Sequence, residues 1–132
     1  MSRKSWTIGM VIPLIAAAGL ATAPAASARG GAGAVTASGA CSAASHWKMK
    51  AKPDSGRMEL ELEIDSNRNG QRWAVRITDN RRLILVGTKV THAPSGSFDV
   101  RRLTANRPGV DHFVAVARNL RTNETCVARV NR

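Results

Sequence analysis

The sequence has no tyrosine, and aromatic residues make up only 4 % of it. It has two cysteines and three histidines among its 132 residues. A chain of this length is enough for one domain, which excludes a multidomain enzyme. Two cysteines are too few for a disulfide-dense scaffold or a four-cysteine zinc module. The hydrophobic content of 43 % argues against a wholly disordered chain.

Acidic residues are also scarce. Nine Asp and Glu stand against 20 Lys and Arg, which gives a formal net charge of +11. A surplus of this size attracts polyanions. Most of the basic residues are arginine, and the chain is also rich in alanine and glycine, so a GC-rich genome is a second explanation for the surplus. The composition leaves both explanations open.

The first 28 residues have the pattern of a secretory signal peptide. Two basic residues precede an uncharged apolar stretch from Met10 to Leu20, and Ala26-Ser27-Ala28 supplies a cleavage site. As a helix, that stretch would span about 16 Å, too short for a hydrocarbon core of about 30 Å. Cys41 lacks the aliphatic residue that precedes a lipid-modified cysteine. We therefore expect an exported, soluble protein with no transmembrane segment and no lipid anchor.

The segment that follows, residues 29–40, consists almost entirely of small residues. Such residues bury too little apolar surface to offset the entropy lost on ordering, which predicts a flexible leader. We expect the folded domain to span residues 41–132.

From residue 46 onward, apolar and polar residues alternate with a period of two, which indicates strands rather than helices. A turn over residues 53–56 would join the first two strands, because it contains proline followed by glycine. The predicted register pairs lysine with glutamate: Lys50 with Glu59 and Lys48 with Glu61. One face of this hairpin would be apolar, and the other would be a ladder of opposite charges that serves mainly to fix the register.

Five further stretches carry the same alternation or a short apolar run, and polar loops rich in turn-forming residues separate them. They are residues 72–77, 83–86, 98–103, 113–117 and 125–130. About seven short strands at this spacing, with no helical pattern and no repeat, predict an all-β domain, either a sandwich or a barrel.

Two features resemble the immunoglobulin-like and fibronectin-like β-sandwiches. Trp73 lies on the third predicted strand, where these domains place a core tryptophan. Residues 111–119 resemble the signature of strand F, with Phe113 in the place of its tyrosine and Ala115 in the place of its cysteine. The resemblance covers roughly residues 41–132. It implies an antiparallel Ig-like sandwich that lacks the tyrosine-corner hydrogen bond and the usual disulfide between the sheets, and it implies no activity.

Cys41 lies just before the first predicted strand, and Cys126 lies in the last. In an exported protein, two cysteines predict one structural disulfide, and the first and last strands of a sandwich are commonly neighbours. A reactive or metal-binding thiol pair is the alternative. The local sequence does not supply the histidine or acidic ligands that such a pair needs.

No constellation of residues predicts catalysis. His46, His92 and His112 are far apart, so the sequence predicts no zinc site. Asp111 precedes His112 directly, but neighbours on a strand point to opposite faces. No glycine-rich phosphate loop precedes a helix. We therefore expect a protein that is not an enzyme and that has no metal and no cofactor.

The strongest candidate for a binding surface is the outer face of the sheet that holds the third strand and the last two. Three valines would point outward there, with arginines around them: Val114, Val116, Val127, Arg72, Arg76, Arg118 and Arg129. A two-residue turn at residues 79–80 would add Leu83 and Leu85 to this face. A one-residue bulge would instead turn the leucines inward.

These patterns favour a small secreted bacterial binding module that engages an anionic cell-surface polymer or a protein partner. The same apolar face could also mediate homo-oligomerisation. No specific nucleic-acid binding is expected, because no aromatic side chains alternate with the basic residues. The alternative function is a secreted inhibitor or toxin-like protein that acts on another enzyme through the loops at residues 65–70 and 120–123.

Overall fold

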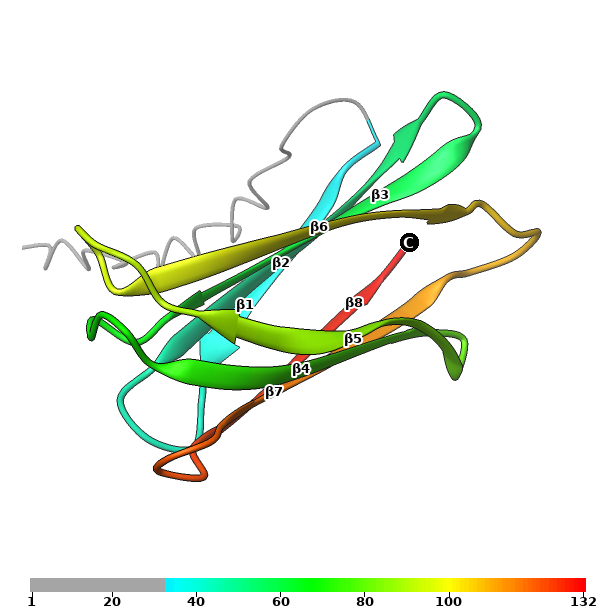
Figure 1. Ribbon diagram of the computed structural model, residues 1–132. Coiled ribbons are helices and arrows are strands. Elements are labelled where there is room, and N and C mark those ends of the chain that lie inside the picture. The colour runs from blue at the N-terminus through cyan, green and yellow to red at the C-terminus, as the bar shows by residue number, and fades with distance from the viewer. Residues whose placement is uncertain (1–32) are drawn as a thin grey trace, which may run out of the picture.

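The computed structural model describes residues 33–132. Eight strands form two antiparallel sheets, and no helix occurs in this part of the chain: β1 (Val35–Ala40), β2 (His46–Asp54), β3 (Arg57–Asp65), β4 (Arg72–Asp79), β5 (Arg82–Val90), β6 (Ser97–Ala105), β7 (His112–Asn119) and β8 (Thr125–Asn131). Sheet A has the order β1-β2-β3-β6, and sheet B has the order β5-β4-β7-β8 (Figure 1). The predicted all-β antiparallel sandwich is confirmed, with eight strands rather than about seven.

The chain reverses direction at each connection, so its loops gather at two ends of the sandwich. The loops β1–β2, β3–β4, β5–β6 and β7–β8 lie at one end, which we call the first end. Backbone hydrogen bonds join these loops, including Ser66 N to Gly96 O at 3.0 Å and Ser42 N to Thr125 O at 2.9 Å. The tight turns β2–β3 and β4–β5 and the longer β6–β7 loop lie at the second end.

The core lies between the two sheets and is built from the inward half of each alternating strand. Its largest members are Trp73, Phe98, Phe113, Met49, Met58, Leu60, Leu62, Ile64 and Ile77. The rings of Trp73 and Phe98 come from opposite sheets, and their centroids are 6.4 Å apart. Burying a side chain of this size contributes about 1.5–3 kcal/mol, so this apolar layer is the main source of stability.

The prediction of a flexible leader is wrong for residues 35–40, which form β1 and pair with β2 from Val35↔Ala51 to Ala40↔His46. Backbone pairing orders this segment even though its side chains bury little apolar surface. Its small residues also permit a close approach, because a Cβ added at Gly39 would lie 2.8 Å from the Trp47 ring. The predicted signal peptide and the start of the leader lie outside the described residues.

The register of the β2–β3 hairpin differs from the prediction by two residues. Lys50 lies opposite Glu61, Lys48 opposite Glu63 and Lys52 opposite Glu59. The cause is a two-residue turn at Ser55-Gly56, whose φ angles are 49° and 78°, so residues 53 and 54 belong to the strand rather than to the turn. A shift of two residues leaves each side chain on the predicted face, so the separation of the apolar and charged faces holds.

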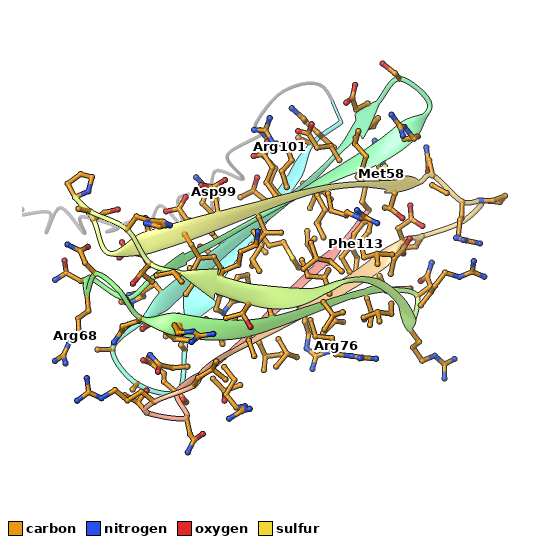
Figure 2. All side chains as sticks on the ribbon, viewed as in Figure 1. Met58, Arg68, Arg76, Asp99, Arg101 and Phe113 are labelled. Carbon is orange, nitrogen blue, oxygen red and sulfur yellow. A yellow bond between two sulfur atoms is a disulfide. The ribbon has the colours of Figure 1, made fainter. Side chains whose placement is uncertain are left out.

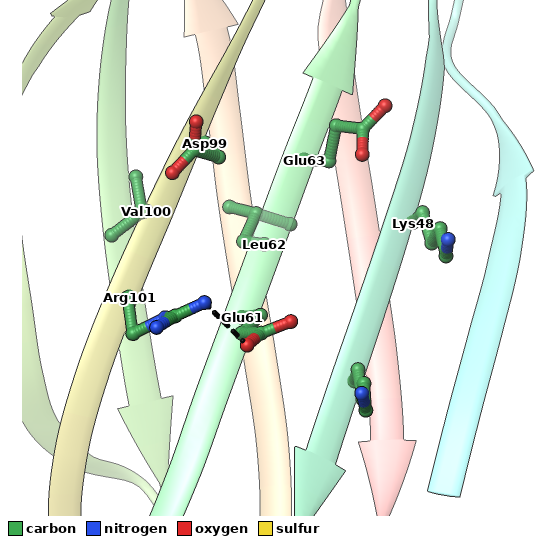
Figure 3. A pocket seen from close by; sticks show the side chains of 8 residues that line it. Lys48, Glu61, Leu62, Glu63, Asp99, Val100 and Arg101 are labelled. Atoms are coloured by element: carbon green, nitrogen blue, oxygen red, sulfur yellow. Dashed lines mark ion pairs between the residues drawn. The ribbon is translucent and has the colours of Figure 1, made fainter. Parts of the chain in front are cut away.

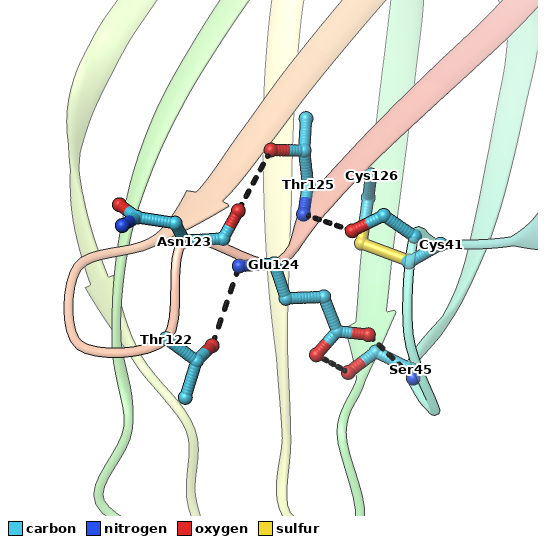
Figure 4. Close-up of a disulfide and its surroundings, with 8 residues drawn as sticks. Cys41, Ser45, Thr122, Asn123, Glu124, Thr125 and Cys126 are labelled. Carbon is cyan, nitrogen blue, oxygen red and sulfur yellow. Dashed lines mark hydrogen bonds between the residues drawn. A yellow bond between two sulfur atoms is a disulfide. The ribbon is translucent and has the colours of Figure 1, made fainter.

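The predicted disulfide is present between Cys41 and Cys126 (Figure 4). It ties the loop after β1 to β8, so it joins sheet A to sheet B at one edge of the sandwich. Thr125 N donates to Ser42 Oγ at 2.9 Å beside it. Within residues 33–132, no helix has the length and apolarity needed to cross a membrane.

Candidate functional site

The outer face of sheet B brings all seven predicted binding residues together. We call it the cationic face. It comprises the outward-pointing residues Arg72, Ala74, Arg76 and Thr78 of β4, Leu83, Val86, Thr88 and Val90 of β5, Val114, Val116 and Arg118 of β7, and Thr125, Val127 and Arg129 of β8. Figure 2 shows Arg76 projecting away from sheet B, on the opposite side from the core residue Phe113.

Strand register sets the arrangement of side chains on this face. One row across the sheet is Val86, Arg76, Val116 and Val127, and the next row is Thr88, Ala74, Arg118 and Thr125. Directly opposite residues on neighbouring strands have Cβ atoms about 5 Å apart. Val116 and Val127 therefore form an apolar strip with Val114, two residues along β7, and Arg76 separates this strip from Val86.

The turn and the leucines differ in part from the prediction. The β4–β5 turn is at Asn80-Arg81, one residue later than expected, and a bulge follows between Ile77 and Thr78. Leu83 points outward as predicted. The prediction is wrong for Leu85, which lies opposite Ile77 and packs against the core. The bulge inserts one extra residue into β5, so the side chains beyond it point to the opposite face from the one predicted. Val86 therefore points outward and is 68 % exposed.

The cationic face carries no carboxylate. Of the nine acidic residues, Glu59, Glu61, Glu63 and Asp99 point outward from sheet A, Asp54 and Asp65 end strands of sheet A, Asp79 and Asp111 are buried, and Glu124 binds Ser45. The arginines of sheet B therefore have no acidic neighbour on their own surface. Charge is segregated between the two faces of the sandwich, and an anion approaching the cationic face meets no repulsion there.

The outer face of sheet A is a mixed surface instead. Lys52 pairs with Glu59 at 2.9 Å, and Arg101 pairs with Glu61 at 2.9 Å. Contact with the Lys52 ammonium group lowers the pKa of Glu59 and raises the pKa of Lys52. A hollow of about 290 Å³ on this face also includes Glu63 and Asp99 (Figure 3). A paired carboxylate with a lowered pKa, such as that of Glu59, suits neither acid nor base catalysis.

The loops of the alternative prediction, residues 65–70 and 120–123, meet at the first end of the sandwich. Together with residues 42–45 they border a polar hollow of about 340 Å³. Internal hydrogen bonds hold these loops. The Glu124 carboxylate accepts from Ser45 N at 2.8 Å and Ser45 Oγ at 2.9 Å (Figure 4), and Asn119 Oδ1 accepts from the backbone of residues 121 and 122.

The histidines do not converge. His46 and His92 lie toward the first end and His112 at the second, where its Nδ1 is 2.9 Å from Asn131 Oδ1. Within the part of the chain that the structure describes, no three His, Cys, Asp or Glu side chains are grouped as metal ligands.

A buried acidic pair at the second end is not among the residues predicted from the sequence. Asp79 and Asp111 are each 1 % exposed, and neither carboxylate oxygen of Asp79 has a hydrogen-bond partner. Burial raises the pKa of Asp79, and the charge of Asp111 raises it further. The alternation through Trp73, Val75 and Ile77 places residue 79 on the inner face. The alternation is therefore a sequence signal for a buried Asp79, but the predicted turn at residues 79–80 includes this position.

Comparison of the chain with protein-family models, with curated proteins and with solved structures finds no match.

Proposed function

We propose that the protein is a secreted, non-enzymatic binding module that engages an anionic polymer or a protein partner at the cell surface through the cationic face. The observation that carries this proposal is the segregation of charge: four arginines surround exposed valines on a face without carboxylates. Exposed apolar patches with a polar rim mark interaction sites, and an uncompensated cationic surface attracts anions.

The Ig-like assignment belongs to the same proposal. Trp73 of β4 and Phe113 and Ala115 of β7 face the core on neighbouring strands, as the sequence resemblance implies for strands C and F. In this assignment β2, β3 and β6 correspond to strands A, B and E, and β1 is an added edge strand. Folds of this type present a broad sheet face on which a binding site can form without changing the core.

The Cys41–Cys126 disulfide is compatible with an extracellular protein, because disulfides persist in oxidising compartments. It supports the proposed export that the pattern of residues 1–28 predicts. A binding role is favoured over catalysis because the described carboxylates are divided among the outer face of sheet A, the buried pair at the second end and the loops, and the histidines are dispersed. A catalytic site needs such groups to converge on one point.

The test is retention of the disulfide-bonded protein on polyglutamate resin at increasing salt concentration. The variant Arg76→Gln/Arg118→Gln should elute at clearly lower salt than the wild type, because it loses two contacts with the polyanion. The matched control Arg57→Gln/Arg102→Gln removes the same charge from exposed residues of sheet A. Equal elution of the two variants would mean that net charge alone acts. No salt-dependent retention of the wild type would contradict the polyanion proposal.

A second candidate function is inhibition of another enzyme through the first-end loops. The observation that favours it is that two loops distant in the sequence meet there and are held by internal hydrogen bonds. Binding by a rigid loop loses little conformational entropy. Assays against a panel of secreted hydrolases test this function. Inhibition that Arg121→Ala weakens would support it, and no inhibition of any member would contradict it.

A further inference from the structure

The cationic face has a hollow of about 450 Å³ beside its strip of valines. The hollow exists because residues with small side chains lie between larger ones. On β4, Ala74 lies between Arg72 and Arg76, and on β5 its neighbours are Thr88 and Gly87. Val86 and Val116 form its apolar walls, and the Arg76 and Arg118 side chains border it. The hollow is open to solvent on its outer side and has room for one large side chain.

A second copy of this chain does not complement the hollow through an isologous contact. An isologous contact would place the cationic face against itself, with arginines opposed to arginines and no carboxylate available on either side. An isologous dimer through the apolar strip is therefore disfavoured, because like charges would be buried together.

A lipid bilayer complements the hollow and its arginines poorly. The apolar groups of the strip are short β-branched side chains, whereas the arginines beside them are long. Lipid phosphates would meet the guanidinium groups before any acyl chain reached the valines. The described aromatic residues are also unavailable, since Trp73, Phe98 and Phe113 are buried and Trp47 packs against the core on sheet A. Membrane-surface binding relies on several protruding aromatic and leucine side chains, and Leu83, near the β4–β5 turn, is the single exposed leucine of the cationic face.

We infer that the hollow takes a single apolar side chain from an acidic protein segment, whose flanking carboxylates pair with Arg76 and Arg118. This inference rests on the proposed function and names its partner class. Arg118 is directly opposite Ala74 on β7, and Arg76 is two residues along β4. The side chains of Arg76 and Arg118 therefore border the hollow on two sides, and Arg118 Nη1 also donates to Asn123 Oδ1 at 2.9 Å. A segment with acidic residues on both sides of one apolar residue matches this arrangement.

The experiment uses two acetylated and amidated peptides, Glu-Asp-Leu-Asp-Glu and Glu-Asp-Ser-Asp-Glu, titrated to millimolar concentration into the ¹⁵N-labelled disulfide-bonded protein. The leucine peptide should bind about tenfold more tightly or better, the gain expected for burying its side chain. Amide shifts should centre on Ala74, Gly87 and Thr88. The variant Ala74→Leu fills the hollow without changing charge and should reduce binding of the leucine peptide to that of the serine peptide. Ala105→Leu, on an exposed position of sheet A, is the matched control.

Equal binding of the two peptides to the wild type overturns the inference, whether or not the Ala74 variant folds. If that equal binding still depends on Arg76 and Arg118, the proposed function stands, but no apolar side chain of the partner occupies the hollow. If neither peptide binds in an Arg76- and Arg118-dependent manner and the protein is not retained on polyglutamate resin, both the inference and the proposed function fail. Tighter binding to phosphatidylglycerol vesicles than to the leucine peptide overturns the inference in favour of a bilayer.

Discussion

Val116 of β7 lies directly opposite Arg76 of β4. On its other side, Val116 lies directly opposite Val127 of β8. Val116 is therefore the position at which the apolar strip meets Arg76, and it lies at the centre of the cationic face. Its side chain is on the outer surface, while the neighbouring Ala115 and Ala117 are buried.

The substitution Val116→Asp separates an interaction surface from a core position. We expect the variant to fold with a loss of at most about 1 kcal/mol in the free energy of unfolding, the range of strand propensity at a surface site. Binding to the acidic leucine peptide should fall about tenfold or more, because the new carboxylate repels the peptide and pairs with Arg76. Urea unfolding and peptide titration measure the two effects. Ala115→Asp is the buried control and should not fold, and unfolding of Val116→Asp as well would contradict its surface role.

The disulfide contributes to stability by restricting the unfolded chain. Cys41 and Cys126 are 85 residues apart, and closing a loop of this length is worth up to about 4.5 kcal/mol in the chain-entropy model. The double variant Cys41→Ser/Cys126→Ser should show a urea midpoint lowered accordingly. Comparison with the single variant Ser42→Ala, which removes only the hydrogen bond to Thr125, isolates the covalent effect. A midpoint for the double variant equal to that of Ser42→Ala would contradict the entropic contribution.

Asp79 should make the protein less stable as the pH rises. Its folded-state pKa is raised, chiefly by burial and then by Asp111, while Arg107, Arg82 and His112 oppose the shift. Ionisation is therefore more costly in the folded than in the unfolded state. The penalty is absent below the ordinary aspartate pKa and is complete above the raised one. Asp79→Asn should be more stable than the wild type at neutral pH.

Thermal unfolding across a pH series measures this effect, and the advantage of Asp79→Asn should vanish in acid. Glu59 supplies a contrast of opposite sign, because contact with Lys52 lowers its pKa. Its stabilising contribution is present above the ordinary glutamate pKa and is lost as the pH falls through the lowered value. Glu59→Gln should therefore be less stable than the wild type at neutral pH and equal to it in strong acid. An Asp79→Asn advantage that does not change with pH would rule out the titration of Asp79 as its cause.

The first-end loops depend on Gly96. Its φ is +70°, and an added Cβ would lie 2.2 Å from the backbone nitrogen of Arg68. Gly70 has a similar φ of +73° but open space around it. Gly70→Ala should cost about 1–2 kcal/mol, the cost of a left-handed conformation, whereas Gly96→Ala should cost at least twice that because the two loops must separate. Urea unfolding of both variants compares the costs, and equal losses would show that the contact is not restrictive.

Alternation along the chain was sufficient to predict most faces correctly. The Lys and Glu residues of β2 and β3 point outward, and Trp73, Phe113 and Ala115 point inward, because a strand that covers a core needs every second residue to be apolar. The outward facing of the predicted valines and arginines on β4, β7 and β8 followed from the same alternation. Alternation, however, does not distinguish two strand registers that differ by two residues. For this reason the observed Lys–Glu pairs differ by two residues from the predicted ones.

The sequence by itself determined the strand content, the facing of most side chains, the pairing of its only two cysteines and the seven predicted valines and arginines of the cationic face, since each depends on local periodicity or on counting. Tertiary structure decided the rest. Pairing with β2 ordered β1 despite its small residues, turn geometry fixed the hairpin registers, and the bulge in β5 exchanged Leu85 for Val86 on the outer surface. The hollow over Ala74 and Gly87 arises only when β4, β5 and β7 are aligned. Such features depend on contacts between residues distant in the sequence, which no local pattern specifies.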